Sequence, residues 1–343
     1  DHGDWLRTIL LSAWGTSNMR TGGDDIAQCL ALMGAKPKWD DMSKRVTGFE
    51  ILPLSVLGRP RVDVTLRISG FFRDAFPQLI SLVDNAATAI MNLDEPVEQN
   101  LAAARFKSGE DRTRVYGAKP GAYGAGLQAL IDERIWNSKS DLGAAYIEWG
   151  SYAYGKDSNG KKKTEDFETR LKQTEAIVQN QDNREHDILD SDDYYQFEGG
   201  AAAAVSTLQG IDRPIYHNDH SRPERPIIRT LEEEISRVVR SRVVNPKWIN
   251  GVKRHGYKGA FEMAATLDYL FAFSATTGAV KSHHFDLTYE AYLEDVETFN
   301  FIKDNNQSAL FEMAQKFKEA LDRGLWRPKS NSARALLEKL ILK

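Results

Sequence analysis

The sequence has a single cysteine, Cys29, among its 343 residues. One cysteine excludes an internal disulfide and any zinc site built from several cysteines. Long hydrophobic runs are also missing, since none approaches the roughly 20 residues that span a bilayer, and no signal peptide opens the chain. These absences predict a cytoplasmic protein with no membrane partner.

The chain also lacks a strong excess of either charge, because 45 basic residues face 49 acidic ones and the net charge is −4. Such a balance indicates neither nucleic-acid binding nor attraction to a charged membrane surface. Hydrophobic residues make up 41% and charged residues 27%, which is ordinary for a globular protein with room for two domains. An initial methionine is absent as well, so we expect a fragment of a longer subunit.

The first part of the sequence, residues 1–155, predicts an α/β domain. Residues 6–14, 49–54 and 62–69 are strand candidates, and helices are expected after Thr21 and after Gly70. This succession of strands and helices is typical of a layer with a short parallel sheet. Gly34 and Pro37 mark the end of the first helix.

The second part, residues 156–343, predicts a mainly α-helical domain. "GKDSNGKKKTED", from Gly155, is expected to be a solvated loop. Helical patterns follow in nearly every segment, at residues 165–180, 230–244, 257–278 and 308–326. The fold class predicted from the whole chain is therefore an α/β part with a short parallel sheet, followed by a mainly helical part.

"GKDSNGKK" nearly matches the phosphate-binding pattern G-x-x-x-x-G-K-[ST]. Its last position is Lys162, which has no hydroxyl for Mg²⁺, and no hydrophobic strand leads into it. We therefore expect that any ATP that drives this protein is hydrolysed by another chain. A second glycine-containing stretch, "AKPGAYGAGLQAL" at residues 118–130, is either a loop that lets backbone approach a ligand or a plain connection.

Histidines are few, and two groups combine them with carboxylates. "HNDH" contains His217, Asp219 and His220, while His255 lies seven residues before Glu262. Imidazole and carboxylate together suit divalent metals such as Co²⁺ or Zn²⁺. A surface or capping role is the commoner one for each of these histidines.

"NREHDILDSDDYYQFEGG", residues 183–200, concentrates acids among aromatic residues and ends on two glycines. If the segment is helical, burial of its aromatic side chains carries Asp193 and Glu198 inward. Buried acids need a hydrogen-bonding partner, a counter-charge or a metal. Two alternatives remain open: a solvated segment whose Asp190 or Ser191 caps a helix, and acids paired with arginines of "HSRPERPIIRTL".

Several long motifs resemble one protein family. They are "WGTSNMRTGGDDIAQCL", "LGRPRVDVTLRISGFFRDAFPQLI", the acidic segment, "SRPERPIIRTLEEEISRVV", "NPKWINGVKRHGYKGAFEM" and "RGLWRPKSNSA". Together they resemble the C-terminal region of the large subunit of aerobic cobaltochelatase, in a family shared with the large subunit of magnesium chelatase. The resemblance runs from about Trp14 to Ser332.

The resemblance implies a ligase-type metal chelatase subunit of cobalamin biosynthesis. Such a subunit is expected to insert Co²⁺ into hydrogenobyrinic acid a,c-diamide together with AAA+ ATPase and metal-binding-domain subunits, and the partners are expected to hydrolyse ATP with Mg²⁺. By the same resemblance, the magnesium branch has a histidine at the position of Asp193 and an aspartate at that of Glu198, and it lacks the histidine of "HGYKGAFEM". Cobalt is therefore favoured over magnesium.

Three other functions stay open. They are insertion of Mg²⁺ into protoporphyrin IX, tetrapyrrole binding without chemistry, and hydrolysis by two carboxylates. We expect the isolated chain to be inactive, because the rest of the active site would lie upstream.

The site residues expected from the motifs and the resemblance fall into three groups. Carboxylates handle the metal or accept pyrrole protons, a histidine is a possible ligand or base, and aromatic and basic side chains shape the ring pocket or hold the ring's carboxylates. They are Glu185, Asp193 and Glu198 as catalytic groups, Asp193, Glu198 and His255 as metal ligands, and Tyr194, Tyr195, Arg184, Arg222, Arg225 and Arg229 as substrate contacts.

Overall fold

The computed structural model describes residues 3–342 and divides into two compact units. Unit 1 comprises Asp1–Asn183 and Gln196–Ile228, and unit 2 comprises Arg184–Tyr195 and Arg229–Lys343. This division differs from the boundary expected at residues 155/156, because unit 1 includes strands from well beyond that point. Each unit is described separately below.

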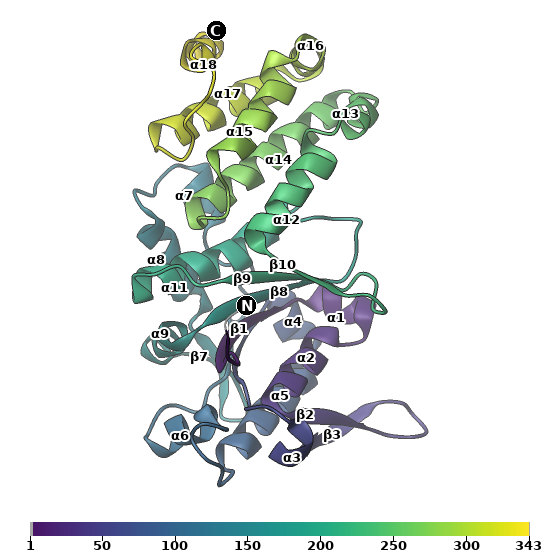
Figure 1. Ribbon diagram of the computed structural model, residues 1–343, viewed down its shortest axis with the longest axis vertical. Coiled ribbons are helices and arrows are strands. Elements are labelled where there is room, and N and C mark those ends of the chain that lie inside the picture. Colours follow the sequence, from purple (N-terminus) through teal and green to yellow (C-terminus); the bar gives the residue numbers. More distant parts are fainter. Residues whose placement is uncertain (1–2, 343) are drawn as a thin grey trace. The chain divides into compact units, whose positions relative to one another are not determined.

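Unit 1 is built on a sheet that, within residues 3–342, has eight strands in the order β10-β9-β8-β1-β4-β5-β6-β7 (Figure 1). The neighbours β9-β8-β1-β4-β5 are all parallel, and β5-β6-β7 are antiparallel. A separate antiparallel hairpin joins β2 and β3. The strands are β1 Thr8–Ala13, β2 Ala35–Trp39, β3 Val46–Ile51, β4 Asp63–Ile68, β5 Val115–Gly117, β6 Tyr152–Gly155, β7 Ser158–Lys162, β8 Ala176–Gln181, β9 Ile215–Asp219 and β10 Ile227–Thr230.

Helices cover both faces of this sheet (Figure 1). The first face packs on α2 and α5, and α8, α9 and α11 pack together over the other. Ser69 caps α4 by accepting a hydrogen bond from the backbone N–H of Phe72. The helices are α1 Gly15–Thr21, α2 Asp24–Met33, α3 Leu54–Leu57, α4 Gly70–Ala75, α5 Pro77–Met91, α6 Leu101–Lys107, α7 Gln128–Asp132, α8 Lys139–Gly150, α9 Thr164–Gln173, the π-helical turn η1 Tyr195–Gly199 and α11 Gly200–Gln209.

The two faces of the sheet differ in chemistry because side chains alternate along each strand. On the face toward α2 and α5, alternate residues such as Ile9, Leu11, Val64 and Leu66 join one hydrophobic core. The residues between them point to the opposite face, and several are polar although every residue of β1, β4 and β8 is buried. The second face must therefore satisfy buried polar groups.

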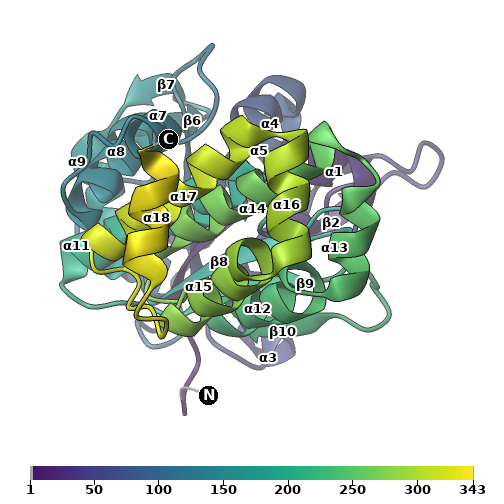
Figure 2. The same cartoon turned by 90° about the horizontal axis from the view of Figure 1, so that it is seen from above.

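Unit 2 is helical (Figure 2). α14 packs against α17, and α18 lies along α17. An aromatic cluster of Phe285, Tyr289, Phe317 and Trp326 forms part of its core, with adjacent ring centroids 5.3–6.5 Å apart. The elements are α10 Asp192–Tyr194, α12 Leu231–Val238, η2 Val239–Val243, α13 Pro246–Lys253, α14 Tyr257–Thr276, α15 Ser282–Tyr289, η3 Glu290–Glu294, α16 Val296–Asn305, α17 Gln307–Asp322 and α18 Ala333–Ile341.

The predicted fold class is confirmed: a parallel sheet with helices comes first and a helical part follows. Three local predictions are wrong. The expected solvated loop contains β7, the helix expected at 165–180 ends at Gln173 and is followed by β8, and β3 pairs with β2 outside the main sheet. Among residues 3–342, no helix is both long and apolar enough to cross a membrane.

A buried ion network fixes the amino end of β4 on the polar face. The Asp63 carboxylate accepts hydrogen bonds from Arg114 Nε at 2.7 Å, Arg170 Nη1 at 2.6 Å and Arg105 Nη1 at 3.0 Å. Burial by itself would raise the pKa of Asp63, but the guanidinium groups of Arg170 and Arg114 lower it well below its ordinary value. One carboxylate thus ties β4 to α6, α9 and the segment before β5.

We expect Asp63→Asn to lower the free energy of unfolding by about 3–5 kcal/mol at pH 7, because the buried guanidinium groups of Arg114 and Arg170 lose their nearest counter-charge and keep only the more distant Glu110. Urea unfolding followed by circular dichroism measures this. Since the pKa is lowered in the folded state, the contribution is complete above pH about 4 and declines as the pH falls further, so the two proteins should converge in acid. Asp94→Asn, at an exposed ion pair with Lys107, is the matched control and should leave the midpoint unchanged.

Candidate functional site

A row of polar residues crosses the sheet beneath α8, α9 and α11, near the carboxyl ends of the parallel strands. Ser12 of β1 pairs with Arg67 of β4, and Arg67 pairs with Tyr116 of β5. On the other side of β1, Leu11 pairs with Val178 of β8, so the next residues along these parallel strands, Ser12 and Gln179, are also aligned. Gln179 in turn pairs with His217 of β9. Residues aligned across parallel strands point to the same face, so this polar row, His217–Gln179–Ser12–Arg67–Tyr116, is continuous.

The polar row is fully enclosed, since none of its members is more than 2% exposed. Within residues 3–342, no hydrogen-bond partner is found for Ser12 Oγ, Arg67 Nε and Nη2, Tyr116 Oη or Gln179 Oε1. Buried polar groups are nearly always hydrogen-bonded, so a concentration of such atoms is unusual for a purely structural region. Ligands of open α/β sheets bind beyond the carboxyl ends of the strands, where the strand order reverses. Here that point lies between β1 and β8.

Glu198 extends the polar row at the His217 end. Both side chains are completely buried, and His217 Nδ1 lies 3.4 Å from Glu198 Oε2. On the other side of the ring, His217 Nε2 is 2.8 Å from Gln181 Oε1, which fixes the orientation of the imidazole. The pair offers one carboxylate oxygen and one ring nitrogen, a donor set that suits Co²⁺ and that can also take up a proton.

The π-helical turn η1 places Glu198 in this position. Phe197 in the same turn is 2% exposed and lies edge-to-face with Trp14, at a centroid distance of 6.0 Å. Single π-helical turns occur frequently at functional sites because the wider turn re-aims side chains. The expectation that Glu198 is carried inward by its aromatic neighbours is confirmed.

Asp193 behaves differently from Glu198, and the expectation that it points inward is wrong. Tyr194 and Tyr195 are buried, at 5% and 3% exposure, but Asp193 is exposed. Desolvation by the surrounding protein, with a smaller effect of Asp192, still raises the pKa of the Asp193 carboxyl. Asp193 belongs to unit 2 and Glu198 to unit 1, because the boundary falls between Tyr195 and Gln196.

The acidic segment is partly neutralised by an arginine that the sequence did not single out. Arg242 donates hydrogen bonds to both oxygens of Asp187, at 2.6 and 2.8 Å, and lies 3.2 Å from Asp190. Its guanidinium also stacks over Trp248. Pairing of acids of this segment with an arginine therefore occurs, through Arg242 of η2.

The other expected site residues lie mostly at the surface. Glu185, Arg184, Arg222 and Arg225 are exposed. Arg229 is half-buried and donates to Glu234 Oε2 at 3.3 Å within unit 2. None of these residues belongs to the polar row.

His255 precedes α14 and is exposed, with its Nδ1 3.7 Å from Glu262 Oε2. Within the described part of the chain, residues 3–342, no group of three or more histidine, cysteine, aspartate or glutamate side chains is placed to hold a metal ion. Of the expected ligands, Asp193 and His255 belong to unit 2 and Glu198 to unit 1. A metal at Glu198 and His217 would need further ligands from elsewhere.

Sequence reasoning missed most of the polar row. Ser12 and Arg67 lie in segments whose sequence predicts apolar buried strands, and Gln179 lies in a segment whose sequence predicts a helix. For His217 the sequence favours a surface or capping role, although the residue is buried in β9. Alternation of polar and apolar residues in "TLRIS" was the available signal for Arg67, whereas "IVQNQ" has no such alternation around Gln179.

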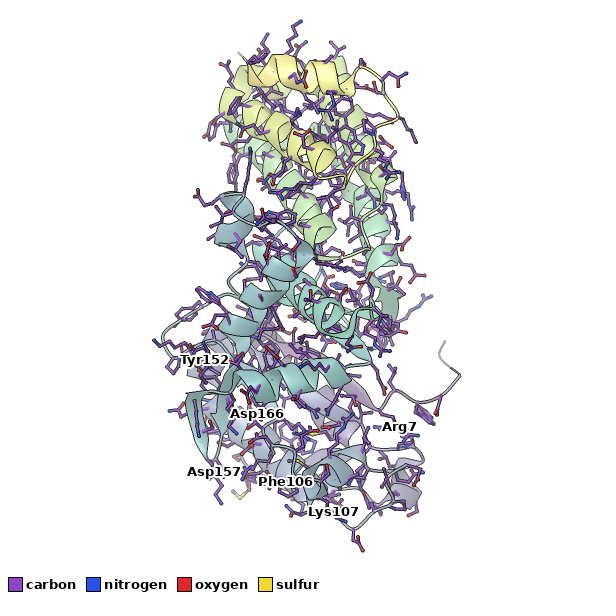
Figure 3. All side chains as sticks on the ribbon, turned by 90° about the vertical axis from the view of Figure 1, so that its left-hand side faces the viewer. Arg7, Phe106, Lys107, Tyr152, Asp157 and Asp166 are labelled. Carbon is purple, nitrogen blue, oxygen red and sulfur yellow. The ribbon has the colours of Figure 1, made fainter. Side chains whose placement is uncertain are left out.

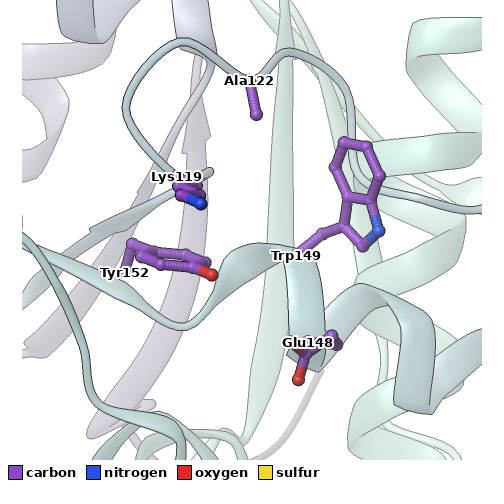
Figure 4. Close-up of a pocket in the computed structure, with 5 residues that line it drawn as sticks. All are labelled: Lys119, Ala122, Glu148, Trp149 and Tyr152. Atoms are coloured by element: carbon purple, nitrogen blue, oxygen red, sulfur yellow. The ribbon is translucent and has the colours of Figure 1, made fainter.

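A shallow pocket of about 210 Å³ lies elsewhere on unit 1 (Figure 4). It is lined by Lys119 and Ala122 of the glycine-containing loop and by Glu148, Trp149 and Tyr152. Gly126, at φ +87°, packs against the Trp149 ring, where a Cβ would come within 2.3 Å of that ring. No residue expected from the sequence to act in catalysis lines this pocket.

Asp25, in the first turn of α2, is a second buried acid near the carboxyl ends of β1 and β8. It is 2% exposed and accepts a hydrogen bond from Asn180 Nδ2 at 2.8 Å. Burial is the largest influence and raises its pKa to about 6, against the hydrogen bonds from Asn180 and the Trp14 backbone. This group can therefore carry a proton near neutral pH.

Comparison with known proteins gives a consistent result over the whole chain. Residues 1–333 match the family model described as CobN/Magnesium Chelatase. The chain is 61% identical to the aerobic cobaltochelatase subunit CobN of a Sinorhizobium species and 54% identical to that of Pseudomonas aeruginosa, covering 97% and 100% of this chain and 27% and 29% of those proteins. A magnesium-chelatase subunit of Rhodobacter capsulatus is 33% identical over 96% of this chain and 28% of that protein.

A solved structure agrees with these relatives. The catalytic subunit of cobaltochelatase from Mycobacterium tuberculosis matches with a TM-score of 0.97 and 45% identity, over 99% of this chain and 30% of that one. The chain thus spans less than a third of the length of the relatives that it matches.

Asp25 generates a pH-dependent prediction. Because its pKa in the folded protein lies above the unfolded value of about 3.9, ionisation between pH 4 and 6 destabilises the fold. Asp25→Asn should therefore gain stability relative to the wild type as the pH rises from 4.5 to 7, by up to about 3 kcal/mol. Thermal unfolding at both pH values measures the difference, with exposed Asp41→Asn as control. A gap between the Asp25 variant and wild type that is independent of pH would contradict the assignment.

Proposed function

Because the chain belongs to the CobN/magnesium chelatase family, we propose that it acts as part of the large subunit of an ATP-dependent cobaltochelatase. The proposed reaction is insertion of Co²⁺ into hydrogenobyrinic acid a,c-diamide in cobalamin biosynthesis, in the cytoplasm. One observation carries the proposal: a completely buried Glu198–His217 pair lies near the carboxyl ends of parallel strands, in a chain 61% identical to a subunit of that name.

Metal insertion requires that Co²⁺ lose water ligands and that two ring N–H groups lose protons. The Glu198 carboxylate can replace a lost water ligand or accept a proton, and enclosure strengthens either interaction because bulk water is excluded. His217, held by Gln181 at 2.8 Å, presents Nδ1 toward the same carboxylate and so orients it. Glu198 is therefore the residue on which we place the chemistry.

The other expected residues take supporting roles in this proposal. Glu185, Asp193 and His255 are exposed carboxylate and imidazole groups that can collect hydrated Co²⁺ before it is bound more tightly. Tyr194, which precedes η1, and Tyr195, its first residue, are aromatic groups for the ring pocket. Arg184, Arg222, Arg225 and Arg229 are cationic groups for the ring's carboxylates.

Energy is proposed to come from partner subunits. "GKDSNGKK" forms part of an antiparallel hairpin, β6–β7, and does not join a strand to a helix as a phosphate-binding loop does. ATP hydrolysis with Mg²⁺ is therefore assigned to AAA+ subunits, which act with a metal-binding-domain subunit on this large subunit.

Variants of the large subunit that contains this chain test the role of Glu198. In the complex reconstituted with its ATPase subunits, we expect Glu198→Gln to slow Co²⁺ insertion at least about 100-fold, because the amide can neither take up a proton nor neutralise the metal. Asp193→Asn should have a smaller effect, since its side chain is exposed, and the double variant should be inactive. Asp157→Asn, labelled in Figure 3 and 69% exposed, is the control and should insert cobalt normally. Normal activity of the double variant would refute the assignment.

The choice of metal is tested in the same complex. We expect Co²⁺ insertion into hydrogenobyrinic acid a,c-diamide to exceed Mg²⁺ insertion into protoporphyrin IX by at least about 100-fold, because identity to cobalt-branch relatives is far higher. Absorption spectroscopy of the two products measures both rates. Faster magnesium insertion would favour the magnesium branch, and ring binding without any insertion would favour a non-catalytic module.

A further inference from the structure

Arg67 differs from the other deeply buried arginines of this chain. Arg61, Arg67, Arg114 and Arg170 are each no more than 1% exposed. Arg61 pairs with Glu95 at 2.7 Å, and Arg114 and Arg170 share Asp63. Among residues 3–342, no carboxylate lies within ion-pair distance of Arg67, which donates to the Ile68 carbonyl through Nη1. A fully buried positive charge is thus left without a counter-charge.

The unpartnered atoms of Arg67 form one edge of the guanidinium. Nε and Nη2 carry two parallel N–H bonds, the edge that binds both oxygens of a carboxylate side-on. Arg61 binds Glu95 in this way at 2.7 and 2.8 Å, and Arg242 binds Asp187 at 2.6 and 2.8 Å. On Arg67 neither nitrogen of the corresponding edge makes a hydrogen bond of good geometry in the described chain, and the Tyr146 hydroxyl that interacts with this guanidinium is neutral and brings no counter-charge.

The surroundings of Arg67 hold it in place without neutralising it. Its guanidinium lies 5.0 Å from the Phe197 ring centre and 5.6 Å from that of Tyr146. Gly150 leaves space beside Nε, where a Cβ would come within 3.0 Å of that atom. Ser12 and Tyr116 of the polar row, and Tyr146, add buried hydroxyl groups that can donate to an oxygen.

A buried charge without a partner is destabilising by several kcal/mol, and arginine does not escape this by losing its proton. Ring faces offset only part of that loss. Buried water molecules could satisfy the N–H groups but would bring no negative charge. An anion with two oxygens meets both requirements.

We propose that the Nε/Nη2 edge of Arg67 binds a carboxylate group of the tetrapyrrole substrate, with hydroxyl groups of the polar row as additional donors. This inference rests on the proposed function and adds a contact that orients the ring relative to Glu198. Because Arg67 is enclosed, a carboxylate reaches it only when a covering ring turns aside. Phe197, which neighbours Glu198 in η1, is the ring in contact with both the guanidinium and Trp14.

Two matched substitutions test the proposal, because methionine resembles arginine in length and is apolar. Arg67→Met removes a buried charge that has no counter-charge, so it should not lower the thermal midpoint of unfolding and is expected to raise it by about 2 °C. Arg61→Met should lower the midpoint, since Glu95 loses its partner. Arg67 would then be a residue that serves binding at the expense of stability, which a structural role does not predict.

Binding is measured by fluorescence titration with hydrogenobyrinic acid a,c-diamide and with its fully methyl-esterified form. We expect the wild type and Arg61→Met to prefer the acid by at least about tenfold, and Arg67→Met to bind both forms equally. Gly150→Ala keeps the charge but fills the space beside Nε, so it should weaken binding of the acid more than of the ester. Loss of affinity for both forms alike in Arg67→Met, with a lowered midpoint, would show a structural role and overturn the proposal. Retained preference for the acid in Arg67→Met would overturn it as well.

The proposed function can fail separately. If the large subunit that contains the wild-type chain binds neither ring form, the chelatase proposal is contradicted. The carboxylate site at Arg67 is then tested separately, by comparing the effect of acetate with that of chloride on the thermal midpoint. Acetate should raise the thermal midpoint of the wild type and Arg61→Met above that in equal chloride, but not the midpoint of Arg67→Met. No difference between acetate and chloride in the wild type would overturn the carboxylate site.

Discussion

Enclosure of a parallel sheet on both faces is the constraint on which the rest of unit 1 depends. Parallel strands need helices on either side, so polar residues on either face must be satisfied inside the protein. One face meets this requirement with an apolar core against α2 and α5. The other face carries polar residues on alternate positions, and its two ends solve the problem in different ways.

At the amino end, the buried guanidinium groups have carboxylate partners within the chain, which are Asp63 and Glu110. Asp63 is shared by three arginines, so every buried guanidinium there has a carboxylate partner. Toward the carboxyl end, Arg67 lacks a carboxylate and Glu198 is paired with His217. The buried charges of the polar face thus have counter-charges at the end that stabilises the fold. Beside the residues to which we assign chemistry, the Arg67 charge has none. Such a division is expected when binding groups are retained against their effect on stability.

The separation of Asp193 from Glu198 also has a physical meaning. Both belong to one acidic segment, yet the wider turn of η1 directs Glu198 into unit 1 while Asp193 stays exposed in unit 2. The Asp193 carboxylate is partly desolvated but can be reached from solvent, so it suits weak, reversible contact with a hydrated cation. A buried carboxylate beside an imidazole suits a step from which water is excluded. The two acids are therefore poorly suited to identical roles.

The fold class, the family, the inward course of Glu198 and the approximate positions of β1, β4, α2, α14 and α17 could be predicted from the sequence, because periodicity, caps and aromatic neighbours act over a few residues. The sequence did not determine β7 or β8, whose short polar or mixed segments become strands only when paired with β6 and with β1. The polar row could not be predicted from the sequence either. Strand register brings together Ser12, Arg67, Gln179 and His217, which are spread over more than 200 residues of the chain. Only the tertiary structure decides which buried charges find partners, because that depends on long-range pairing that local sequence does not encode.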